Sequence, residues 1–461
     1  MNNSNIRLSF FLCVLVFVAA YSLPAYSQAT TDKPPIIDSR LRQMVVDNIS
    51  RELELRYVAP ERVKDIVSYL RTKLQSGAYD KIESANEFAS ALTSDLRTAG
   101  KDLHLQVTYD PVLERALRSA PSLPSFELPE LPPNPEQIIR QRQSNYDFRK
   151  LEIMRGNVGY LELKSFVDLN RSKETAVAAM SFLANTDAVI IDLRHNPGGF
   201  INLEIFLASY FYGVDPVELL SRYHREGDVT VREWTLREVP GKRLQNVDLY
   251  ILTSRETGSA GEGFSFILQQ RQRAKLIGEQ TSGAGYGNKE FPVGNGFVFY
   301  ISTFRQFDPR TGRGWQAVGV KPDIAVPGER ALSVAHFEAI KNLIDKTSDA
   351  RRKQQLSWLA GLLQFEAQGA KTIPTAVLES YTGKYAVGIV VSLEQGQLYF
   401  LGASGVRRKL YALSDETFLI EDHSVPSENQ ARVRFIKNAA GNVTELQLMV
   451  ADGRTFPRAK E

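Results

Sequence analysis

Ser259 occupies a position where a serine can act as a nucleophile. Residues 247–253 predict a short buried strand, and residues 262–273 carry apolar side chains at helical spacing. A serine between the two would most often be a helix cap. The same place suits a nucleophile, because the dipole and free amides of a helix N-terminus stabilise an oxyanion by roughly 0.3–2 kcal/mol.

A pair of glycines, Gly198 and Gly199, follows a second apolar run at residues 188–194. Adjacent glycines are more often a simple turn, but they also let the backbone approach a ligand and present N–H groups to it. About 60 residues separate this pair from Ser259, and each motif follows a predicted buried strand. We therefore expect the two loops to meet at the carboxyl edge of one sheet.

Five motifs in this order resemble the tail-specific (C-terminal processing) serine peptidases, in the branch related to interphotoreceptor retinoid-binding protein and the tricorn core protease. They occupy residues 159–166, 192–199, 253–262, 277–283 and 319–323. The resemblance covers about residues 36 to 345. It implies that Ser259 is the nucleophile, that the amides of Gly199 and Ala260 form the oxyanion hole, and that Gly198 shapes the turn.

The identity of the general base is open between a lysine and a histidine. Relatives with a Ser–Lys dyad carry the lysine in a Thr-x-Gly-Lys-Gly motif, where this chain has Ala284. Lys275 and Lys289 are close in sequence but fit better as helix-terminal or solvated residues. The other branch takes its base from an upstream histidine, and His104 matches it. A neutral imidazole suits general-base work near pH 7.

The segment around His104, residues 102–108, predicts a strand. Alternation would place Leu103, Leu105 and Val107 on the core face and would turn His104 away from the core. A lone histidine on a polar strand face is usually just solvated, so the catalytic role rests on the resemblance.

Two positions depart from the pattern of these relatives. Leu103 stands where a serine or glycine often precedes the histidine, and Gln316 stands where a carboxylate is common. Gln316 could orient the ring of the histidine but adds no charge to stabilise an imidazolium. Asp102 or Glu262 would supply that charge if either lies near the ring.

Other catalytic arrangements fit the sequence less well. An α/β-hydrolase order could be drawn from Ser259, Asp323 and His336, but Thr257 replaces the first glycine of the nucleophile elbow. The glycine-rich residues 283–287 lack the Gly-Lys-Ser/Thr ending of a nucleotide loop.

Residues 1–27 predict an export signal, with Arg7, an apolar run and a small-residue cleavage pattern. The run is too short to span a membrane with these flanks. Cys13 lies within it, so the mature chain would contain no cysteine for disulfides, thiol catalysis or metal binding. The mature charge of about +2, from 55 basic and 53 acidic residues, argues against a nucleic-acid surface. We expect a periplasmic or extracellular protein without cofactor or metal.

The resemblance and the patterning together predict a multidomain α/β (α+β) protein with a crotonase-like, ClpP-like peptidase core. Residues 381–457 alternate apolar and polar side chains in short runs, which predicts an antiparallel β domain that resembles lipocalin-like modules. The expected parts are a helical N-terminal domain (28–122) ending in the His104 strand, a Pro-rich linker (123–150), the serine peptidase core (151–330), a helical link (331–368) and the lipocalin-like β domain (369–461).

The sequence thus predicts an exported serine-type peptidase that cleaves peptides or protein C-terminal segments with Ser259 and His104. The alternative is a protein of the same fold that has lost hydrolysis and binds peptides or hydrophobic ligands. Leu103 and Gln316 favour this alternative, whereas the intact serine and glycine motifs favour the enzyme. We expect a peptide or protein substrate, no nucleic acid and no membrane-spanning segment after signal removal; an oligomer is compatible with the sequence.

Overall fold

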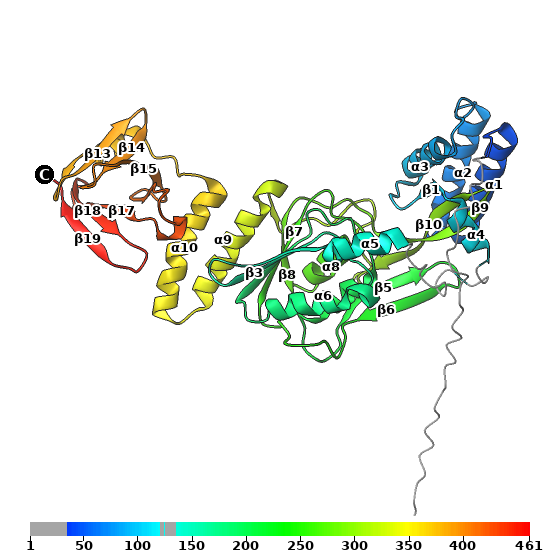
Figure 1. Ribbon diagram of the computed structural model, residues 1–461, viewed down its shortest axis with the longest axis horizontal. Helices are drawn as coiled ribbons and strands as arrows, with labels where there is room; N and C mark the ends of the chain where they lie inside the picture. The colour runs from blue at the N-terminus through cyan, green and yellow to red at the C-terminus, as the bar shows by residue number, and fades with distance from the viewer. Residues whose placement is uncertain (1–34, 120–123, 125–134) are drawn as a thin grey trace, which may run out of the picture.

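The computed structural model describes residues 35–119, 124 and 135–461. The expected export signal at residues 1–27 and most of the Pro-rich part of the expected linker lie outside these residues. Figure 1 shows an elongated molecule with a helical lobe at one end, a mixed α/β centre and a β domain at the other end. Among the described helices, none is long and apolar enough to cross a membrane.

The helical lobe contains α1 (Ser39–Arg56), α2 (Pro60–Gln75) and α3 (Ala85–Gly100). Their apolar stripes form one core with two strands that come much later in the chain, β9 (Tyr286–Gly294) and β10 (Phe297–Phe307). The lobe is therefore completed by strands from the segment expected to belong to the peptidase core.

The strands that support the lobe form an antiparallel sheet in the order β1-β10-β5-β6, with β9 also paired to β10. The new members are β1 (Gln106–Tyr109), β5 (Glu218–His224) and β6 (Val229–Trp234). Two helices, α4 (Pro111–Ser119) and α5 (Pro135–Gln143), flank the undescribed segment.

A second sheet forms the centre of the molecule, in the order β11-β8-β7-β4-β3-β2. All neighbours are parallel except β2, which is antiparallel to β3. The strands are β2 (Phe148–Met154), β3 (Val158–Leu163), β4 (Ala188–Asp192), β7 (Asp248–Thr253), β8 (Ala274–Gly278) and β11 (Ile324–Ala325).

Helices cover both faces of this sheet, which explains why its strands read as continuous apolar runs. One face packs against α6 (Leu169–Phe182), α7 (Ile201–Ser209) and α8 (Ala260–Gln270). The other face packs against α9 (Gly328–Lys346), and α10 (Ala350–Gln368) packs against α9 in the same core. The expected helices after Gly199 and Ser259 are thus α7 and α8.

The C-terminal β domain is an antiparallel meander of the strands β12 to β19. A bridge between Tyr385 and Lys460 brings its ends together into a nearly closed barrel. Its interior is filled by aromatic side chains such as Tyr381 and Phe435, whose rings stack with centroids 4.2 Å apart. The strands are β12 (Gly383–Tyr385), β13 (Ile389–Glu394), β14 (Gln397–Leu401), β15 (Arg407–Ala412), β16 (Thr417–Ile420), β17 (Arg432–Lys437), β18 (Val443–Met449) and β19 (Thr455–Ala459), with the helices α11 (Thr375–Ser380) and η2 (Ser427–Asn429).

One expected element differs in the structure. The strand that the sequence predicts from residue 102 begins only at Gln106, and Leu103 and His104 form a turn before it. Leu105 and Val107 are buried as expected, but Leu103 is 47% exposed. The alternation therefore applies only to the second half of the predicted strand.

Candidate active site

Ser259 lies in the turn between β7 and α8, at the N-cap of the helix. Its backbone has φ 46° and ψ −118°, a conformation that is uncommon and strained for a residue with a side chain. The amide of Ser259 donates a hydrogen bond to Glu262 Oε2 at 3.0 Å, which holds the turn against the first turn of α8. The hydroxyl is 3.2 Å from Nε2 of His104.

The glycine loop after β4 lies directly against this serine, because β4 and β7 are parallel neighbours and end at the same edge of the sheet. Gly198 and Gly199 have φ 120° and 136°, where side chains are disfavoured. A Cβ on Gly198 would lie 2.6 Å from Ser259 Cβ, and one on Gly199 would lie 2.2 Å from the carbonyl oxygen of Phe166. Both positions therefore require glycine.

The two amides expected to form an oxyanion hole, those of Gly199 and Ala260, are available for a ligand. In the described part of the chain, neither amide has a recorded hydrogen-bond acceptor. The groups on either side of Gly199 are engaged instead: the Phe166 amide donates to Gly198 O at 2.9 Å, and the Phe200 amide donates to Phe166 O at 2.6 Å.

Asn196 fixes the glycine loop, and its role was not foreseen from the sequence. The residue is fully buried, and its Oδ1 accepts a hydrogen bond from the Gly198 amide at 2.8 Å. Its carbonyl oxygen accepts from the Gly258 amide at 2.9 Å, which joins the glycine loop to the serine turn. An asparagine two residues before a glycine is a recognisable sign of such a turn.

His104 reaches Ser259 from the turn that precedes β1. Its side chain is only 15% exposed, so it is not the solvated histidine that a polar strand face would give. Burial lowers the pKa of His104, the negative charge of Asp102 raises it, and the positive charge of Arg97 lowers it. The net effect places this pKa below the usual value of 6.5, so the ring is neutral and able to accept a proton at pH 7.

Asp102 is the carboxylate on the far side of the histidine ring. Its Oδ1 lies 3.8 Å from Nδ1 of His104, and Nδ1 has no hydrogen-bond partner among the described residues. Asp102 is fully buried and accepts hydrogen bonds from the His104 amide at 3.0 Å and from the Tyr57 hydroxyl at 3.1 Å. The ring of His104 therefore lies between the hydroxyl of Ser259 and the carboxylate of Asp102.

Gln316 does not take the place on the ring that its sequence position suggested. Its Oε1 accepts hydrogen bonds from the amides of Gly285 and Tyr286 at 2.8 and 2.9 Å, and its Nε2 donates to Lys101 O at 3.2 Å. Within the described residues, no hydrogen bond joins Gln316 to His104. The glutamine instead ties the 285–286 loop to the segment that carries Asp102 and His104.

Glu262 also serves the loops rather than the histidine. Besides the Ser259 amide, its carboxylate accepts hydrogen bonds from the amides of Gly283 and Ala284 at 2.7 and 2.8 Å and from the Thr281 hydroxyl at 2.5 Å. Burial raises its pKa, and these hydrogen bonds oppose the shift. Ala284, the residue in place of the family lysine, is thus held against the carboxylate.

The remaining candidates are engaged elsewhere. Lys275 pairs with Glu338 of α9 at 3.1 Å, on the opposite face of the sheet from α8. Asp323 accepts a hydrogen bond from the Leu276 amide at 2.7 Å, and His336 bonds to the carbonyl oxygen of Arg155 at 2.8 Å. The α/β-hydrolase order is therefore not assembled, and the described residues contain no cluster able to hold a metal ion.

Comparison with known proteins gives three family matches. Residues 157–326 match peptidase family S41, residues 36–143 match the N-terminal domain of peptidase S41 in eukaryotic IRBP, and residues 367–456 match a domain of unknown function (DUF3471).

Curated relatives include processing proteases from two bacteria. The carboxy-terminal-processing protease of Bartonella bacilliformis is 27% identical over 175 residues, which are 37% of this chain and 39% of the relative. The carboxyl-terminal-processing protease of Synechocystis sp. is 29% identical over 171 residues, 37% of this chain and 38% of the relative. The match thus spans about two fifths of the length of either relative.

Among solved structures, the photosystem II D1 C-terminal processing protease matches with a TM-score of 0.40 and 17% identity, over 62% of this chain and 94% of that chain. The tricorn protease matches with a TM-score of 0.43 and 14% identity, over 69% of this chain and 38% of that chain. The family matches confirm the resemblance found in the motifs, and the chain belongs to peptidase family S41, with an IRBP-type N-terminal domain.

Proposed function

We propose that the protein is an exported serine-type peptidase that cleaves peptides or C-terminal segments of proteins, with Ser259 as nucleophile and His104 as general base. The observation that supports this most directly is the 3.2 Å contact between His104 Nε2 and Ser259 Oγ. This contact lies at a strained turn beside two free amides, which is the arrangement that acyl transfer needs.

In the proposed reaction, His104 Nε2 accepts the hydroxyl proton of Ser259 while Oγ attacks the carbonyl carbon of the substrate. The amides of Gly199 and Ala260 donate hydrogen bonds to the oxyanion that forms. The imidazolium then gives its proton to the leaving amine as the carbon–nitrogen bond breaks. Water, deprotonated by the same ring, hydrolyses the acyl-enzyme and regenerates the serine.

Asp102 supports the imidazolium in this scheme. Its carboxylate lies 3.8 Å from Nδ1, where a negative charge favours the protonated ring without a direct hydrogen bond. Gln316 acts as a positioning residue, because it fixes the backbone on both sides of the site through Lys101 and Gly285.

The finer points of the prediction belong to the same proposal. They are a crotonase-like, ClpP-like fold of the core, the expected domain boundaries, a periplasmic or extracellular location and the absence of a nucleic-acid partner. The family match supports the peptidase core, and the signal pattern at residues 1–27 supports export. The alternative of a binding protein is less favoured, because the serine and the histidine are in contact.

A fluorophosphonate probe tests the proposal, since it reacts only with an activated serine. The wild-type protein should be labelled, and Ser259→Ala should abolish labelling and peptide hydrolysis. The thermal midpoint should change little, because a hydroxyl is removed without leaving a large cavity. Ser181→Ala, on the exposed side of α6, is the matched control and should be labelled normally. Equal labelling of Ser259→Ala and wild type would exclude Ser259 as the nucleophile.

A further inference from the structure

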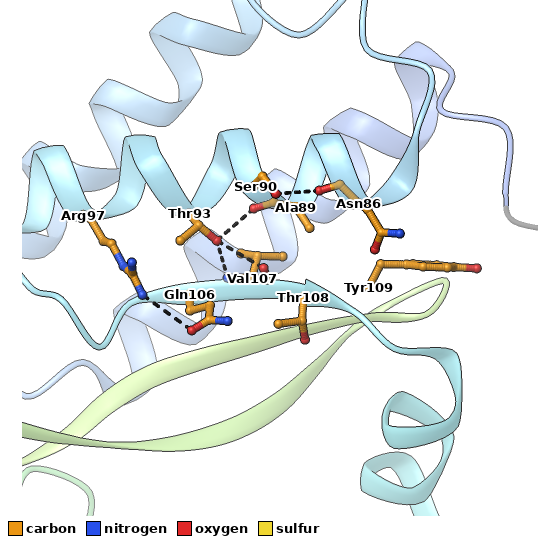
Figure 2. A pocket seen from close by; sticks show the side chains of 9 residues that line it. All are labelled: Asn86, Ala89, Ser90, Thr93, Arg97, Gln106, Val107, Thr108 and Tyr109. Carbon is orange, nitrogen blue, oxygen red and sulfur yellow. Dashed lines mark hydrogen bonds between the residues drawn. The ribbon is translucent and has the colours of Figure 1, made fainter. Parts of the chain in front are cut away.

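A polar groove runs between α3 and β1, next to the turn that carries His104. Figure 2 shows the side chains that line it, and its cavity volume is about 410 Å³. The helix contributes side chains of one face, among them Asn86, Ser90, Thr93 and Arg97. The strand contributes residues 106–109.

On the edge of β1 that faces this groove, backbone amide and carbonyl groups already form hydrogen bonds with side chains of α3. Thr93 Oγ1 accepts a hydrogen bond from the Val107 amide at 2.8 Å and lies 3.1 Å from the Val107 carbonyl oxygen. Arg97 Nε donates to the carbonyl oxygen of Leu105 at 3.0 Å. A ligand in the groove would therefore be recognised by side chains and not by adding a strand to β1.

Arg97 supplies the charge of the groove. Besides the bond to Leu105, its guanidinium makes one long contact, 3.5 Å from Nη2 to Gln106 Oε1. Among the described residues, no carboxylate lies within 4.0 Å of it. A guanidinium is always charged and presents its donors in a planar fork that fits a carboxylate. This end of the groove is therefore suited to a carboxylate ligand.

The charged end of the groove lies on the histidine side of the active site. Gln106, which contacts Arg97, follows His104 by two residues, a reach of roughly 7 Å along the chain. In the proposed reaction the histidine gives its proton to the leaving amine, so the segment after the cleaved bond must pass His104. Arg97 bonds the carbonyl oxygen of Leu105, the residue after His104, so its guanidinium lies near the histidine that this segment would pass.

We propose that the groove between α3 and β1 binds the leaving segment of the substrate, and that Arg97 pairs with a carboxylate of that segment. The carboxylate is either the C-terminus of the peptide or an aspartate or glutamate side chain near it. This inference rests on the proposed function for the direction of the substrate, but the binding of a carboxylate peptide does not require catalysis.

The test uses full-length Ser259→Ala protein, so that peptides bind without being cleaved. Three fluorescein-labelled hexaalanine peptides serve as probes in fluorescence anisotropy: one with a free C-terminus, one amidated, and one amidated with glutamate as its fifth residue. The free acid should bind about tenfold more tightly than the amide, the factor that one hydrogen bond to a charged group supplies. Tight binding of the glutamate amide would identify a side-chain carboxylate as an accepted ligand; weak binding would restrict the groove to the C-terminus.

Substitutions at position 97 locate the effect. Arg97→Gln should reduce the acid-to-amide ratio to near one, and Arg97→Lys should keep part of it, because the charge remains without the planar fork. Thr98→Glu, an exposed change on the neighbouring side of α3, is the control. This variant should retain most of the preference for the free acid over the amide. Circular dichroism and the thermal midpoint establish that each variant is folded.

Equal binding of the acid, the glutamate amide and the plain amide by the folded Ser259→Ala protein would overturn the proposal. So would an acid preference that persists in Arg97→Gln. Fluorophosphonate labelling of the protein with its serine intact is read separately. An unlabelled protein that prefers the acid through Arg97 would overturn the peptidase function and leave the carboxylate site standing.

Discussion

At the scale of single residues, the partner of the histidine ring is the feature that sequence reasoning could not choose. The motifs led to Ser259 and His104, but Gln316, Asp102 and Glu262 were all candidates for the supporting group. The outcome depends on a turn at Leu103 and His104, in which the histidine amide donates to Asp102 Oδ1. An aspartate directly before a turn, whose side chain accepts from the amide two residues later, is a local signal for this geometry. The buried contact from Tyr57 to Asp102 is long-range and gives no such signal.

Removal of the Asp102 charge should move the acid limb of the pH profile. Because this charge raises the pKa of His104, Asp102→Asn should lower that pKa, and activity should persist to lower pH. The maximal rate should fall by roughly 10- to 1,000-fold, since the imidazolium loses support. The measurement is kcat/KM against pH, with Asp65→Asn, an exposed change on α2, as control. An unchanged acid limb in Asp102→Asn would contradict the assignment of this carboxylate.

The wild-type profile tests the base itself. Burial holds the pKa of His104 below 6.5, so activity should be level near pH 7 and should fall only when the pH drops below 6.5. His104→Ala should lose about 100-fold or more in rate, the usual contribution of positioned proton transfer. Lys289→Ala distinguishes a Ser–Lys dyad from the Ser–His pair. Loss of activity in Lys289→Ala, together with full activity in His104→Ala, would make lysine the general base.

At the scale of elements, the strand–loop–helix units around Gly199 and Ser259 were predictable, because buried parallel strands are continuous apolar runs. Their ends were less so: the helix expected at residues 262–273 begins at Ala260 and ends at Gln270. The predicted strand began too early, at residue 102 instead of Gln106. The alternation of apolar and polar residues cannot distinguish the exposed Leu103 from a core residue. The pairing of β1 with β10, about 190 residues later, is set by tertiary contacts that no local pattern contains.

Glu262 connects these elements, and its removal should loosen the site. The Glu262 carboxylate accepts hydrogen bonds from the amides of Ser259, Gly283 and Ala284. In Glu262→Gln, one carboxylate oxygen becomes an NH₂ group, which is a donor and would face these amide donors. We expect a loss of about 3 kcal/mol in unfolding free energy, because buried donors lose their acceptor. Urea unfolding measures this loss, and fluorophosphonate labelling should slow in parallel.

The chain provides a matched control for this change. Glu87 occupies the same third position of α3, three residues after the cap Ser84, but it is exposed. Glu87→Gln should alter the stability by less than about 0.5 kcal/mol, as surface substitutions usually do. A similar effect of the two substitutions would mean that the loop contacts of Glu262 contribute nothing beyond ordinary helix capping.

At the scale of the whole molecule, the site lies where two parts meet. His104 precedes the strand that joins the helical lobe, whereas Ser259 and the glycine loop belong to the central sheet. The β domain lies at the opposite end, beyond α10 (Figure 1). Composition and patterning predicted a β domain, but not how it joins the rest. Trp358 of α10 contacts two residues of the β domain. Its Nε1 donates to the carbonyl oxygen of Glu428 at 2.9 Å, and its ring centroid lies 3.7 Å from Cζ of Arg432.

These contacts determine what removal of the β domain should do. A chain that ends at Gly369 keeps α10, whose Leu356 and Leu359 pack in the core with α9, but it exposes Trp358. We expect a lower thermal midpoint and a greater tendency to aggregate, because apolar surface is uncovered. Labelling of Ser259 should stay within about twofold of the full chain, since distant sites act independently. In the full chain, Arg155→Ala is the control, because it removes the contacts of Arg155 with Glu366 of α10 and with Ser427 and Glu428 of the β domain but leaves the β domain itself in place. A folded truncated chain without labelling would show that the β domain supports the active site after all.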